Sequence, residues 1–211
     1  MKKLLAVMAV AGLAGLAHGQ IWNESGDAGD LGGGQGTGAG ALSQILGNLD
    51  ANDVDMYTIR VDDWSLFLAS ATDVSGLGSP EADTQLFLFA ADGTGIAMND
   101  DTAVGTGLRS EFENGNPIYS GRTNGEIVWI AISGYNQDPT AGGSTIWANS
   151  PFNVTRAPDG VNPAGVVDAW SGANATGGTY RITLRGVSAV PAPGALALLG
   201  LGGLVAARRR R

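Results

Sequence analysis

The chain has 211 residues, with 20 acidic and 12 basic side chains, a formal net charge of −8 and no cysteine. All 20 acidic residues lie between residues 20 and 189, against only six arginines, so this segment carries −14 and repels the phosphates of nucleic acid. It also has no lysine, histidine or cysteine, which excludes Ser-His-Asp, Cys-His and Ser-Lys catalysis, lysine Schiff bases, disulfides and zinc held by His or Cys.

Residues 1–19 have the pattern of a secretory signal peptide. Met1, Lys2 and Lys3 give a positive start, and residues 4–17 form an apolar run. Small residues at Ala17 and Gly19 favour cleavage before Gln20 by signal peptidase, after passage through the Sec translocon. An uncleaved anchor is the alternative interpretation.

The segment after the cleavage site is rich in glycine. Residues 21–40 contain three consecutive glycines, but no lysine and no following helical pattern, so a phosphate-binding loop is not indicated. We expect a flexible or turn-rich segment here.

Short apolar runs separated by Gly, Asn and Asp then predict strands rather than helices. The expected strands cover residues 42–49, 54–61, 64–70, 84–90, 95–98, 127–133 and 179–185. The run 84–90 is apolar on both faces and predicts a central strand that is covered on both sides. Residues 179–185 alternate between apolar and polar, which is typical of a strand with one wet face.

These strands predict an all-β fold, an antiparallel and jelly-roll-like β-sandwich, in one domain over residues 20–189. We also expect a helix in the signal peptide and a hydrophobic helix near the C-terminus. Residues 134–178 are turn-rich, and the pattern does not place them.

Several stretches of this domain resemble the bacterial pre-peptidase C-terminal module, an extracellular β-sandwich. They occupy residues 24–29, 53–57, 83–89, 92–93, 99–101 and 178–180. The resemblance implies a non-catalytic accessory or surface domain. Related collagen-binding modules hold calcium.

Acidic side chains crowd several of the expected turns, and calcium prefers such oxygen ligands. The candidate ligands are Asp53, Asp55, Asp83, Asp92, Asn99, Asp100 and Asp101. The alternative is that these residues only make Asx-turns and hydrogen-bond the strand ends.

Residues 190–211 combine a proline motif, an apolar run and a basic end. The motif is Val190, Pro191, Ala192, Pro193 and Gly194, and the basic end is Arg208, Arg209, Arg210 and Arg211. The apolar run 194–207 would span about 21 Å as a helix, less than the roughly 30 Å of a bilayer core. By the positive-inside rule the arginines stay in the cytoplasm.

This tail resembles the sorting signal of PEP-CTERM proteins, although alanine stands where that family usually has glutamate. The resemblance implies recognition and removal of the tail by an exosortase-like membrane enzyme. A permanent anchor is the alternative.

Together the patterns predict an exported, non-catalytic protein of the cell surface or extracellular matrix, anchored in the membrane transiently or permanently. Contact with exopolysaccharide is expected, and calcium is the candidate cofactor. The alternative function is a carbohydrate-active enzyme that uses paired carboxylates. The five tryptophans, Trp22, Trp64, Trp129, Trp147 and Trp170, are expected to pack in the protein rather than stack on sugars.

Overall fold

The computed structural model describes residues 19–71, 83–102, 108–173 and 177–192. The expected signal peptide, apart from Gly19, and the tail from Pro193 to Arg211 lie outside the described residues. Within the described part, no helix is long and apolar enough to cross a membrane.

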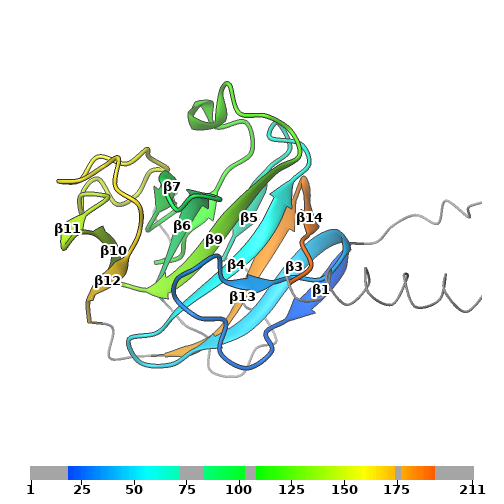
Figure 1. Cartoon of the computed structure of the whole chain (residues 1–211), viewed down its shortest axis with the longest axis horizontal. Helices are drawn as coiled ribbons and strands as arrows, with labels where there is room; N and C mark the ends of the chain where they lie inside the picture. Colours follow the sequence, from blue (N-terminus) through cyan, green and yellow to red (C-terminus); the bar gives the residue numbers. More distant parts are fainter. Residues whose placement is uncertain (1–18, 72–82, 103–107, 174–176, 193–211) are drawn as a thin grey trace, which may run out of the picture.

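The described chain is almost entirely β-structure (Figure 1). Its strands are β1 (Gln20–Asn23), β2 (Gln35–Gly36), β3 (Gly40–Leu49), β4 (Val54–Val61), β5 (Leu68–Ser70), β6 (Thr84–Ala90), β7 (Gly95–Asn99), β8 (Glu111–Phe112), β9 (Glu126–Gly134), β10 (Gln137–Ala141), β11 (Ser144–Thr145), β12 (Ala169–Gly172), β13 (Gly178–Arg185) and β14 (Val187–Ala189). A single 3-10 turn, η1 (Pro117–Tyr119), is the only helical element of the described residues.

Two sheets form a sandwich that is nearly closed like a barrel. The strand order is β7-β6-β9-β4-β14-β3-β13-β5-β8, and neighbours along it are antiparallel. β3 joins the two layers, because its first residues pair with β14 and its later residues pair with β13. The short strands β1 and β2 add parallel pairings to β3 and β4. The predicted all-β antiparallel sandwich is confirmed.

The main core lies between the two sheets and follows the predicted alternation. Tyr57 and Ile59 of β4 and Ile182 of β13 are fully buried there. Arg60 and Arg185, at outward positions of these strands, are exposed. Burial of one face of each strand therefore sets the register, since a slip of one residue would expose every core side chain.

A second core lies on the other face of β6, which confirms that this strand is covered on both sides. Leu86 and Leu88 face the main core, whereas Phe87 and Phe89 face the second core. Residues 137–172, which belong to the region whose structure the sequence pattern does not predict, cover this face, and we call them the cover. There, β10, β11 and β12 form a small three-stranded sheet (Figure 1).

Two tryptophans hold the cover against β6. Trp147 is buried, with its ring 5.6 Å from the rings of both Phe87 and Phe89. Trp170 lies 5.3 Å from the Phe87 ring and donates a hydrogen bond to the carbonyl of Asp30 at 2.7 Å. The expected packing of the tryptophans within the protein is borne out for both rings.

Two sequence expectations need correction. Of the expected strand 64–70, only Leu68–Ser70 is a strand, because Asp63 binds the backbone N–H and the hydroxyl of Ser65 and holds a turn. The glycine-rich segment 21–40 contains turns, as expected, but also the paired strands β1 and β2.

The two ends of the described domain meet at one end of the sandwich. Gln20 of β1 pairs beside Leu42, and Ala189 of β14 pairs with Gly40, so both termini lie against the start of β3. Figure 1 shows β1 and β14 on the side away from β10, β11 and β12. The acidic turns that follow β3 and β7 lie at the other end of the sandwich. There the start of β4, the end of β9 and the start of β6 are side by side, since Ser133 pairs with both Val54 and Gln85.

Candidate functional site

A pocket of about 280 Å³ opens beside the β6–β7 hairpin, on the end of the sandwich away from the termini. Four aspartates line it, together with polar and apolar side chains from three other segments. The residues are Asp83, Gln85, Met98, Asp100, Asp101, Leu108, Tyr135, Asn136, Asp138, Asn149, Phe152 and Arg156.

Antiparallel pairing brings three of the predicted ligands together. Asp83 directly precedes β6, and Asp100 and Asp101 directly follow β7. Because Leu86 pairs with Asn99, the start of β6 and the end of β7 lie side by side. One carboxylate oxygen from each of the three aspartates lies within 4.8 Å of the others. We call Asp83, Asp100 and Asp101 the hairpin cluster.

Asp100 is the least accessible member of the hairpin cluster. Its side chain is only 5% exposed, and its Oδ1 has no hydrogen-bond partner among the described residues. Burial and, after it, the negative charges of Asp101, Asp83 and Asp138 together raise the pKa of Asp100 to about 7, against an opposing effect of Arg156. The ionised carboxylate therefore lacks a compensating charge.

Asp138 approaches the same pocket from β10. Gln85, which is 3% exposed, donates to Oδ1 of Asp138 at 3.3 Å, and its own Oε1 accepts from the backbone N–H of Gln137 at 3.1 Å. Burial raises the pKa of Asp138, while the bond from Gln85 and the charge of Arg156 lower it. Gln85 thus ties the β9–β10 turn to β6 and holds Asp138 at the pocket.

Asn99 braces the acidic loop from within. Its Oδ1 accepts from the backbone N–H of Glu111 at 2.7 Å, and its Nδ2 donates to the carbonyl of Asp101 at 2.9 Å. The backbone N–H of Asp101 also donates to the carbonyl of Phe152 at 3.0 Å. The structure therefore gives Asn99 a positioning role and does not place it among the clustered carboxylates.

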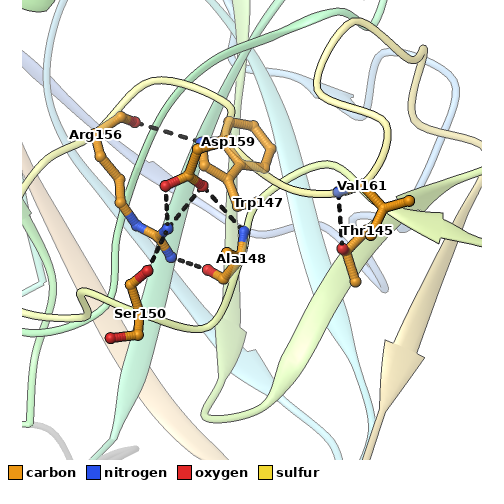
Figure 2. A network of polar contacts seen from close by, with 7 residues as sticks. All are labelled: Thr145, Trp147, Ala148, Ser150, Arg156, Asp159 and Val161. Atoms are coloured by element: carbon orange, nitrogen blue, oxygen red, sulfur yellow. Dashed lines mark hydrogen bonds and ion pairs between the residues drawn. The ribbon is translucent and has the colours of Figure 1, made fainter.

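Arg156 organises the loop that forms the other wall (Figure 2). Its Nη1 donates to both carboxylate oxygens of Asp159 at 2.7 Å, and its Nη2 donates to the carbonyl of Ala148. The indole N–H of Trp147 points at the Arg156 carbonyl, 3.4 Å away. Because Asp159 takes up the guanidinium charge, Arg156 shapes the wall more than it neutralises the pocket.

A second acidic group lies where β3 turns into β4. Glu24, Asp27 and Asp55 each place one carboxylate oxygen within 4.8 Å of the others. We call these three residues the β4 cluster. Glu24 and Asp27 also carry backbone hydrogen bonds, since they accept from Ala28, Asn48 and Gly29.

Asp55 is completely buried in the β4 cluster. Its Oδ2 accepts from the Tyr180 hydroxyl at 2.6 Å, whereas its Oδ1 has no partner among the described residues. The pKa of Asp55 is raised to about 8, chiefly by burial, with the Tyr180 hydrogen bond opposing the rise and the charges of Glu24 and Asp53 contributing to it. A Cβ on Gly47 would lie 2.2 Å from the Tyr180 hydroxyl, so the absence of a side chain there makes room for this contact.

Besides Asn99, two more predicted ligands lie outside both clusters. Asp53 accepts from the backbone N–H groups of Asp50 and Val54, at 3.1 and 2.9 Å, and fixes its own turn. Asp92 lies at the far end of the β6–β7 hairpin, where it accepts from the backbone N–H and hydroxyl of Thr94 at 3.0 and 2.7 Å. These bonds, the hydroxyl first, lower the pKa of Asp92. Both residues follow the Asx-turn interpretation.

Sequence reasoning missed Asp138, Glu24 and Asp27 as members of these sites. Asp138 belongs to the segment that the pattern could not place, although its position just after the apolar strand β9 was a usable signal. Glu24 and Asp27 stood in a motif of the family resemblance but not among the candidate ligands. Comparisons of the chain with known protein families, curated proteins and solved structures found no match.

Proposed function

We propose that this protein is an exported, non-catalytic module of the cell surface or extracellular matrix that holds calcium at the hairpin cluster. The observation that carries the proposal is the buried Asp100 carboxylate, with an unpartnered oxygen beside Asp83 and Asp101. Burying an uncompensated carboxylate is costly, and a bound cation removes that cost.

The donor chemistry supports a hard cation. The pocket offers carboxylate and amide oxygens, with no histidine or cysteine anywhere between residues 20 and 189. Calcium takes six to eight oxygen ligands and tolerates irregular geometry. The β4 cluster offers a second group of the same kind around the buried Asp55.

The location of the protein is part of the same proposal. The signal peptide would pass the Sec translocon as a helix, and the hydrophobic helix of the tail would hold the chain at the membrane until an exosortase-like enzyme acts. Both domain ends lie at the start of β3, so the pocket would face away from the attachment point, toward exopolysaccharide. We also propose that the sandwich has a jelly-roll-like topology.

Thermal unfolding in calcium and in chelator tests the cation site. Calcium at about 100 times its Kd would add about 2.7 kcal/mol to the free energy of unfolding, a rise of roughly 5–10 °C in Tm. Asp100→Asn should lose most of this rise. Asp92→Asn, a carboxylate outside both clusters, is the matched control and should keep it.

Asp55→Asn separates the two clusters in the same measurement. A rise that survives Asp100→Asn but disappears in Asp55→Asn would move the site to the β4 cluster. An unchanged Tm between calcium and chelator in the parent protein would refute calcium binding.

A carbohydrate-active enzyme is the second candidate, and the raised pKa of Asp100 favours it. A buried acid of this kind beside ionised carboxylates can act as a general acid. However, three carboxylates with oxygens within 4.8 Å of one another form a converging group rather than the two facing carboxyls, roughly 5–9.5 Å apart, that glycosidases use. Turnover of polysaccharide that vanishes in Asp100→Asn would establish the enzyme instead.

A further inference from the structure

The hairpin cluster would leave a bound cation incompletely coordinated on the side of the pocket. Three carboxylates converge, whereas calcium takes six to eight oxygens. Ligands beyond those that the carboxylates and the neighbouring backbone supply would come from the 280 Å³ space in front of the cluster. That volume is near the lower end of the roughly 300–1,000 Å³ that is usual for small-molecule pockets.

The rim of this pocket carries unusual aromatic side chains. Tyr135 is 54% exposed and Phe152 is 51% exposed, and both line the pocket. All 14 aromatic residues fall within the described part of the chain, and these two are the only ones that are mainly exposed, the others being buried or partly buried. They come from the β9–β10 turn and from the loop before Arg156, so the fold gathers them from two separate segments.

The chemistry of the rim complements that of the floor. Exposed apolar groups beside a polar cavity indicate a ligand that has both kinds of surface. A sugar has this character, because its hydroxyls are oxygen ligands for calcium and its C–H face packs on aromatic rings. Asn136 and Asn149 also line the pocket and add amide groups that can hydrogen-bond hydroxyls.

We propose that the pocket binds one sugar residue of a polysaccharide, whose neighbouring hydroxyls complete the coordination of the cation while its ring packs on Tyr135 and Phe152. This inference rests on the proposed cation site. The occupant is a glycan rather than an organic amine, because an amine would compete with calcium for the same carboxylates.

Titration calorimetry on the exported protein tests the proposal, with a panel of methyl glycosides that carry vicinal hydroxyls and their deoxy analogues. We expect binding in calcium, none in chelator, and loss of binding for the deoxy analogues. Tyr135→Ala and Phe152→Ala should each weaken glycoside binding about 3- to 10-fold and leave calcium affinity unchanged. Leu66→Ala, which removes a side chain 54% exposed outside the pocket lining, is the control and should change neither.

The outcomes separate the two proposals. If calcium binds but no glycoside of the panel does, the glycan inference is overturned while the cation site stands. Glycoside binding that persists in chelator, or that is unchanged in both aromatic variants, also overturns it. If calcium itself does not bind, the proposed function fails first.

Discussion

At the scale of the residue, the two buried aspartates are where this protein departs from an ordinary β-sandwich. Asp55 and Asp100 each have a carboxylate oxygen without a partner among the described residues, and both have a raised pKa. Such groups reduce stability when they ionise without a counter-charge. A cation site requires such buried carboxylates to lie beside other acidic side chains, as these two do.

The raised pKa values predict an unusual dependence of stability on pH. In the unfolded chain both aspartates ionise near pH 3.9, whereas in the folded, calcium-free protein Asp100 holds its proton until about pH 7 and Asp55 until about pH 8. Between pH 4 and 8 the folded state therefore binds more protons, and the free energy of unfolding falls as pH rises. We expect a loss on the order of a few kcal/mol.

Chelator-treated protein, unfolded with denaturant at a series of pH values, measures this loss. Asp100→Asn should make the free energy of unfolding fall less steeply at pH values up to 7, and Asp55→Asn should do the same up to pH 8. Added calcium should restore more stability at pH 8 than at pH 5. Stability that rises from pH 5 to pH 8 in chelator would contradict the assigned burial.

At the scale of the element, β6 connects the two cores and carries the site at its start. Leu86 and Leu88 pack in the main core, and Phe87 and Phe89 pack under the cover formed by residues 137–172. Asp83 and Gln85 stand at the pocket end of this strand. The cover is therefore part of the site, because its strand β10 supplies Asp138 and its loops supply Phe152 and Arg156.

Trp147→Ala should test how strongly the cover is docked. Trp147 is 2% exposed between Phe87 and Phe89, so its removal leaves a cavity and should cost about 3–5 kcal/mol of the free energy of unfolding. Phe152→Ala, on the exposed rim, should cost about 0.5 kcal/mol or less. Denaturant unfolding monitors both, and equal costs would mean that the cover does not depend on this ring.

At the scale of the whole molecule, the fold separates the two ends of the described domain from the pocket. Along β4, Ile59 pairs with Ala189 near the termini, and Val54 pairs with Ser133 near the pocket. The five residue steps from Val54 to Ile59 correspond to about 16 Å of strand. The proposed sorting motif begins at the terminal end, where the backbone N–H of Thr37 donates to the Val190 carbonyl at 2.8 Å.

Intact-mass measurement of the native protein checks the proposed processing. We expect a mature chain that begins at Gln20 and lacks the apolar run and the arginines. Replacing Pro191 and Pro193 by alanine should leave the tail attached, while Asp92→Asn should be processed normally. A native protein that keeps its whole tail would instead be a membrane-tethered module.

The sequence by itself determined the class of fold and the faces of its strands. Alternation in β4 and β13 and the double apolar faces of β6 are local patterns, and burial of those faces is what they encode. The composition likewise excluded lysine, histidine and cysteine chemistry from residues 20–189, because these residue types are absent there.

Only the tertiary structure decided which acidic turns meet. Asp83 and Asp100 converge because two strands pair in one register, and Asp92, on the same hairpin, is carried to the other end. Asp138 and the aromatic rim arrive from a segment without periodicity, whose position depends on Trp147 and Trp170 docking on β6. Strand faces follow from neighbours in sequence, whereas a site follows from contacts between distant segments, which no local pattern records.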